Sequence, residues 1–93
     1  MVVGILELKI VIRDARSLKD KRRVIKSLKD RIRNDFNVSI AEVGDMDFRQ
    51  QAVLGAAVVT NEQGFAGKVL QKIVDFVRRV PVVQIVDYHV EML

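Results

Sequence analysis

The chain has 93 residues, which suits one domain, because each half of a divided chain would bury too little surface to fold alone. Apolar residues make up 49% and charged residues 30%, with one proline and five glycines, which excludes a disordered chain. No apolar run approaches the roughly 20 residues that a membrane-spanning helix needs. There is no cysteine, and so no disulfide or thiolate metal site. We expect one soluble, cytoplasmic domain over residues 1–93.

Positive charge is concentrated in one segment. The formal net charge is +4, and ten of the sixteen Lys and Arg residues lie between Arg13 and Arg33. Only three acids accompany them, so this segment carries +7, while the other six cations and nine acids sum to −3. Such an uneven distribution of charge favours partners that carry negative charge, with nucleic acid first among them.

Residues 2–12 alternate in polarity, which predicts a strand. Its even positions form an aliphatic row that should face the core, and its odd positions mix apolar and charged side chains. A helix follows, with Ser17 as the N-cap and Asp20 three residues later as a short capping-box acid. At about 100° per residue, its apolar residues share one arc toward the sheet. The helix should end near residues 34–36.

Residues 38–43 read as a second strand and residues 44–49 as a hairpin loop. Residues 51–60 are apolar on both faces, which predicts a central strand. Asn61 is suited to cap a second helix, which Pro81 stops, and residues 82–93 return as a fourth strand. In that strand we expect Ile85, Asp87, His89 and Glu91 to share one face.

The order βαββαβ predicts an α+β, ferredoxin-like fold, with a four-stranded antiparallel sheet and both helices on one face. The first and third strands should be central. The other sheet face is then uncovered, and an apolar patch of that kind tends to be covered by a partner. We expect a homo-oligomer through this face or a strand edge, with these interface residues: Ile5, Val11, Val53, Ala57, Val59 and Ile85.

The first helix carries the strongest functional signal. Arg22, Lys26, Lys29 and Arg33 fall in a stripe about 60° wide, flanked by Lys19 and Arg23. Cations so spaced can neutralise successive phosphates of a nucleic acid. The alternative is a solvated helix face with weak ion pairs to nearby acids.

Other residues give weaker signals. Lys21 falls within the apolar arc of the first helix, where we expect its stem to snorkel past the end of the sheet. The G-x-x-G spacing of Gly64 and Gly67 occurs in loops that clamp nucleic acid, but here it lies at a helix start, where packing explains it better. Asp45 and Asp47 are too few acids for a cation site, and His89 suits an ordinary surface imidazole. The sequence thus predicts no catalytic residue, metal, cofactor or small-molecule substrate.

Three stretches carry a resemblance to a known family: Arg16–Arg23 (RSLKDKRR), Ser27–Arg31 (SLKDR) and Asn37–Gly44 (NVSIAEVG). They resemble the YlxP-like bacterial family of unknown function, and the likeness covers nearly the whole chain, including Asp87 and Tyr88. Asp45 and Phe48 stand where the family commonly has histidine and tryptophan. The resemblance implies a small ferredoxin-like protein with no established activity. Genes of that family often neighbour translation and ribosome-maturation genes, so the resemblance also implies an RNA or ribosome connection.

Three functions remain open from the sequence. The first is a non-enzymatic protein that contacts RNA or the ribosome through the basic helix. The second is an interaction module that binds itself or another protein through the uncovered sheet face. The third is an enzyme of unrecognised type, which would need a deep pocket that gathers several polar groups.

Overall fold

The computed structural model describes residues 1–93, whose helices and strands follow one another in the order βαββαβ. The predicted order of elements is confirmed. The bounds are β1 Val2–Val11, α1 Leu18–Asp35, β2 Ser39–Gly44, β3 Gln51–Thr60, α2 Gln63–Arg78 and β4 Gln84–Met92.

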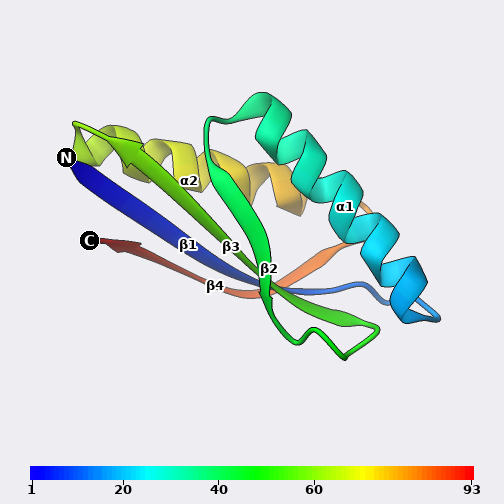
Figure 1. The fold of residues 1–93 in the computed structure, drawn as a ribbon. Helices are drawn as coiled ribbons and strands as arrows, with labels where there is room; N and C mark the ends of the chain where they lie inside the picture. The colour runs from blue at the N-terminus through cyan, green and yellow to red at the C-terminus, as the bar shows by residue number, and fades with distance from the viewer.

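The four strands form one antiparallel sheet in the order β2-β3-β1-β4. The first and third strands are therefore central, as their apolar character predicts. Both helices cover the same face of the sheet and diverge from each other along their lengths (Figure 1). This arrangement confirms the predicted α+β, ferredoxin-like fold and leaves the second face of the sheet uncovered.

The core lies between the sheet and the helices. The even positions of β1 pair with the even positions of β3, so two central aliphatic rows point toward the helices. The amphipathic faces of α1 and α2 close over them. The buried members are Leu6, Leu8 and Ile10 of β1, Ala52, Leu54, Ala56 and Val58 of β3, Ile25, Leu28 and Ile32 of α1, and Ala66, Leu70, Ile73, Val74 and Val77 of α2.

A register shift in β4 corrects one sequence prediction. Asp87 lies opposite Lys9, but Ile85 lies opposite Ile10, because a bulge interrupts the pairing at Val86. Ile85 therefore points to the helix-covered side and packs against the core. Its predicted place on the uncovered face was wrong, since strict alternation along the strand does not hold across a bulge.

The two helix starts differ in how well the sequence predicted them. Ser17 caps α1 as expected, and its Oγ accepts a hydrogen bond from the Asp20 amide at 3.1 Å. The cap of α2 is Glu62 rather than Asn61, and its two carboxylate oxygens accept the amides of Gly64 at 2.8 Å and Phe65 at 2.7 Å. A charged carboxylate that meets two free amides is favoured at the positive end of a helix.

This cap also accounts for one glycine of the G-x-x-G spacing. A Cβ at residue 64 would lie 2.8 Å from Glu62 Oε1, so glycine leaves room for the capping carboxylate. The spacing therefore belongs to the helix start. Neither helix is long and apolar enough to cross a membrane.

Candidate nucleic-acid interface on helix α1

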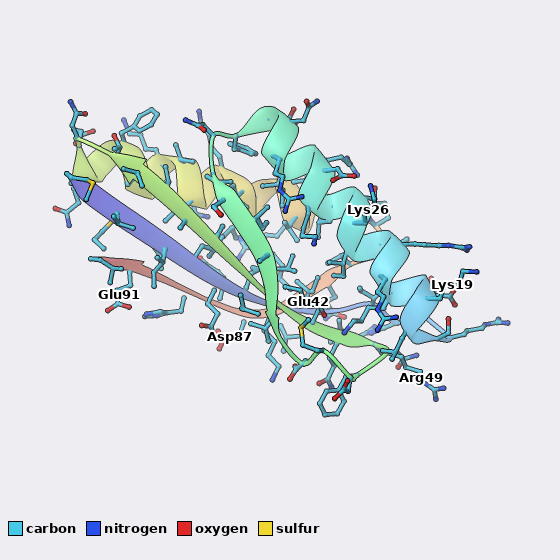
Figure 2. All side chains as sticks on the ribbon, viewed as in Figure 1. Lys19, Lys26, Glu42, Arg49, Asp87 and Glu91 are labelled. Atoms are coloured by element: carbon cyan, nitrogen blue, oxygen red, sulfur yellow. The ribbon has the colours of Figure 1, made fainter.

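Helix α1 presents one buried face and one charged face. Its buried residues are Lys21, Ile25, Leu28 and Ile32, which fix the helix against the sheet. The cations on its other side consequently face solvent along a rod of 18 residues, or about 27 Å. Figure 2 shows Lys19 and Lys26 on this helix, whereas Asp87 and Glu91 lie on the opposite side of the sheet.

Four of the six predicted contact residues carry unneutralised charge. Lys19, Arg22 and Arg23 are exposed and Lys29 is half-buried. None of the four has a carboxylate oxygen within 4.0 Å, since the ion pairs of the chain involve other residues. These four side chains, Lys19, Arg22, Arg23 and Lys29, are called the free cations of α1 below.

The other two predicted residues share one acid. Lys26 Nζ lies 2.7 Å from Asp30 Oδ2, and Arg33 Nη1 lies 3.7 Å from Asp30 Oδ1. The hydrogen bond from Lys26, together with the charges of Lys26, Arg33 and Lys29, holds the pKa of Asp30 below its usual value. Asp30 therefore stays ionised at neutral pH and offsets part of the positive charge in the middle of the helix.

Arg33 also has a structural contact. Its Nη2 donates to the main-chain oxygen of Ile40 at 2.9 Å, which links the last turn of α1 to β2. Strand β2 is an edge strand, and an arginine bound to its backbone hinders the approach of another strand. Arg33 is consequently less available to a phosphate than the free cations.

Lys21 is not on the surface at all. Its side chain is 1% exposed and its Nζ lies 2.9 Å from Glu42 Oε2, whose side chain is 12% exposed. Its ammonium also donates to the main-chain oxygens of Asp45 and Gln51, each at 2.9 Å, and of Met46 at 3.4 Å. The prediction that Lys21 snorkels past the end of the sheet was wrong, because protein oxygens surround its ammonium in place of water.

Two of the main-chain acceptors of Lys21, Asp45 and Met46, lie in the loop between β2 and β3, and the third, Gln51, is the first residue of β3. Asp45 adopts φ 56°, the left-handed conformation, at the start of this loop. Gln50 ties its far end to the loop before α1, since Gln50 Nε2 donates to the main-chain oxygens of Arg13 at 3.0 Å and Ala15 at 3.1 Å. The first turn of α1 and the two loops therefore form one cross-bonded end of the molecule.

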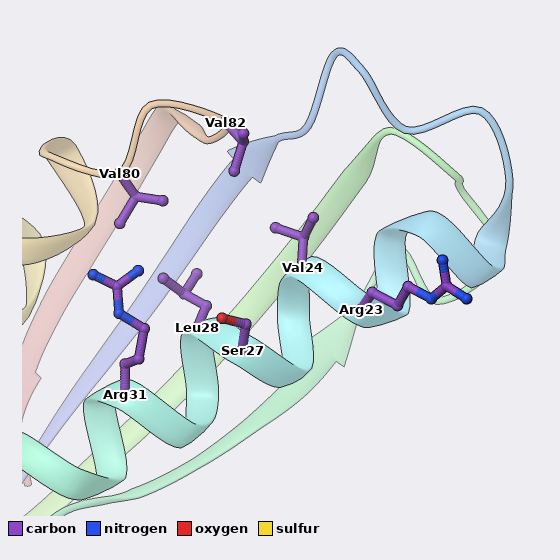
Figure 3. Close-up of a pocket in the computed structure, with 7 residues that line it drawn as sticks. All are labelled: Arg23, Val24, Ser27, Leu28, Arg31, Val80 and Val82. Atoms are coloured by element: carbon purple, nitrogen blue, oxygen red, sulfur yellow. The ribbon is translucent and has the colours of Figure 1, made fainter.

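A groove beside α1 contains an arginine that the sequence did not single out. It opens between α1 and the connection from α2 to β4, and Arg23 and Arg31 both line it (Figure 3). The guanidinium carbon of Arg31 lies 4.9 Å from the centre of the Phe76 ring on α2. No local pattern marks Arg31, because its surroundings depend on how the two helices diverge.

The uncovered sheet face is half apolar and half charged. Ile5, Val11, Val53 and Ala57 are half-buried on it, and Val59 is 64% exposed. Toward β4 the face becomes charged, with Glu7 opposite His89 and Lys9 opposite Asp87 across the pair of strands. No group of three or more His, Cys, Asp or Glu side chains is placed to hold a metal ion.

Comparison with known proteins places the chain in a family. Residues 3–90 match the family model described as "Protein of unknown function (DUF503)". The chain is also 37% identical over 83 residues to a Bacillus subtilis (strain 168) protein named "Uncharacterized protein YlxP", covering 89% of this chain and 90% of that protein. The chain belongs to the DUF503 family.

Membership of the DUF503 family supplies no activity, because the printed names of the family and of YlxP state none. It does confirm the resemblance that the sequence motifs indicate. Within those motifs, Ser17 caps α1, and Lys21 and Glu42 form the buried ion pair. At least three residues of the motifs therefore have a structural reason to be present.

A solved structure supports the fold independently. The structure titled "De novo designed protein Foldit4" covers 100% of this chain and 97% of its own, with a TM-score of 0.58 and 12% identity. At that identity the likeness concerns only the arrangement of helices and strands.

Proposed function

We propose that this DUF503 protein is a cytoplasmic, non-enzymatic protein that contacts RNA, on the ribosome or elsewhere, through the free cations of α1. The observation that supports this proposal is that Lys19, Arg22, Arg23 and Lys29 lie along one rigid helix without carboxylate partners. The translation-linked gene neighbourhood that the resemblance implies favours RNA among polyanions.

The distribution of charge defines how a polyanion approaches. The acids Glu7, Asp87 and Glu91 lie on the uncovered sheet face, on the opposite side from α1. A phosphate backbone is therefore attracted to the helix layer and repelled from the sheet face. Each cation that neutralises a phosphate releases a counterion, so binding weakens steeply with salt.

Filter binding of single-stranded RNA across a salt series tests the proposal. The variant R22Q/R23Q/K29Q removes three free cations of α1. We expect its affinity at low salt to fall at least about tenfold, and its slope of log K against log salt to decrease by about 2.

The matched control is K68Q/K72Q/R79Q, which removes the same charge from exposed positions on and next to α2. If binding depends on α1, this control keeps nearly all the affinity of the unaltered protein. Equal losses in the two variants would point to net charge alone, and salt-insensitive retention of all three proteins would contradict RNA contact.

A second candidate function is self-association. Two contacts favour the uncovered sheet face over the strand edges as the surface that mediates it. Arg33 donates to the Ile40 oxygen of β2, and the amide of Tyr88 in β4 donates to Asp87 Oδ1 at 2.9 Å. Each contact occupies a main-chain group on an edge strand, whereas Val59 and the half-buried apolar residues of the face have no cover.

Sedimentation velocity tests this second function. We expect a dimer at micromolar concentration that Val59→Lys converts to a monomer, because a charge would be placed in the apolar half of the contact. A monomer of the unaltered protein at that concentration would refute self-association and leave RNA contact unaffected.

A further inference from the structure

The groove between α1 and the α2–β4 connection has the dimensions and lining of a small ligand site. Its volume is about 230 Å³. Val24 and Leu28 of α1 form one side of its apolar lining, and Val80 and Val82 of the connection form the other (Figure 3). Pockets for drug-sized ligands span about 300–1,000 Å³, so this groove suits a single ring system.

Polar groups occur along one line at the rim of the groove. Arg23, Ser27 and Arg31 are four residues apart on α1, so their side chains follow each other along the helix. The guanidinium of Arg31 extends toward Val80 (Figure 3), and its contact with the Phe76 ring, 4.9 Å away, limits its movement. Neither arginine has an acidic partner within 4.0 Å.

We propose that this groove binds one unpaired nucleobase of RNA, with Arg23 and Arg31 on the flanking phosphates. The inference rests on the proposed function and specifies its ligand as single-stranded or bulged RNA. The apolar walls accept the face of a base, and the Ser27 hydroxyl can donate to or accept from its edge. Arg23 is itself a free cation of α1, so a strand bound to the helix already passes the groove.

The lining argues against an apolar peptide as the occupant. An apolar side chain of a peptide would cover Arg23 and Arg31 without supplying a negative charge to pair with them. Removing the two unpaired guanidinium charges from water would then be costly. A nucleotide brings an apolar ring and a negative charge together. A duplex does not fit, because its bases remain stacked inside the helix.

Two variants and two RNA-like probes test the groove separately from the basic surface. Ser27→Phe fills the groove from an exposed position, whereas Asn34→Phe places the same side chain at an exposed position of α1 outside it. The probes are an oligouridylate and an abasic ribose-phosphate oligomer of equal length, which carry the same charge with and without bases.

We expect the unaltered protein and Asn34→Phe to bind the oligouridylate at least about fivefold more tightly than the abasic oligomer, the low end for one well-stacked base. In Ser27→Phe the affinity for the oligouridylate should fall to the affinity for the abasic oligomer. Equal binding of both probes by the unaltered protein, or an undiminished preference in Ser27→Phe, would overturn the groove inference while salt-dependent RNA contact stands. Absence of salt-dependent binding to either probe would overturn both.

Discussion

Lys21 of α1 and Glu42 of β2 form an ion pair of 2.9 Å in which the lysine is almost fully enclosed. A lysine ammonium has three donors, and the main-chain oxygens of Asp45, Met46 and Gln51 accept them. Glu42 is thus held mainly by opposite charge. The pair connects the helix that carries the free cations to the loop between β2 and β3, so it fixes the end of the molecule from which α1 begins.

Lys21→Met should destabilise the protein by about 3 kcal/mol, because it leaves Glu42 without its counter-charge and three main-chain oxygens without a donor. Urea unfolding measures the loss. Lys19→Met, at an exposed position on the same helix, should change stability by less than about 0.5 kcal/mol.

The double variant Lys21→Met with Glu42→Leu should be more stable than Lys21→Met alone, since it removes the unpaired carboxylate as well. If the single variant were as stable as the unaltered protein, the enclosed ion pair would not hold the loop.

The cap of α2 gives a prediction with a control at the adjacent residue. Glu62→Ala removes the acceptor of two main-chain amides and should lower the free energy of unfolding by about 1 kcal/mol. Asn61→Ala should change it by less than about 0.5 kcal/mol, because Asn61 does not cap the helix. Thermal or urea unfolding distinguishes the two positions. A larger loss of stability in Asn61→Ala than in Glu62→Ala would instead identify Asn61 as the cap of α2.

The fold could be predicted from local patterns because each pattern is determined within one element. The alternation in β1, the helical period of α1 and the doubly apolar character of β3 each depend on residues a few positions apart. Together they identified every helix and strand and the central strands. The basic face of α1 follows from the same period.

Features that depend on distant residues could not be predicted in that way. Ile85 changes face because of a bulge that is defined only against β1, and Lys21 is buried because the β2–β3 loop folds over it. Arg31 becomes part of a groove only where α1 and α2 diverge. Each of these depends on a pairing between segments, which a single sequence does not reveal.

Asp30 provides a test of charge on the exposed face of α1. The hydrogen bond from Lys26 keeps its pKa low, so the folded state is favoured above the unfolded pKa of the carboxyl and loses that contribution as pH falls through the folded pKa. Lys26→Gln should move the pKa of Asp30 upward toward its usual value. An NMR titration of the Asp30 carboxyl carbon measures the change, with Lys68→Gln on α2 as the control. No movement in Lys26→Gln would show that the pair is not formed in solution.

The outer edge of β4 is partly blocked by the side chain of Asp87. The Tyr88 amide donates to Asp87 Oδ1 at 2.9 Å, so this amide is not open to another strand. Asp87→Ala exposes the amide and removes a charge from an edge strand, and both changes favour pairing with a second chain. We expect Asp87→Ala to associate at lower concentration than the unaltered protein in sedimentation velocity, and to aggregate faster on mild heating. Asp87→Asn removes the charge but keeps an oxygen acceptor, so it should associate less than Asp87→Ala. Equal association by the two variants would assign the protection to charge rather than to the occupied amide.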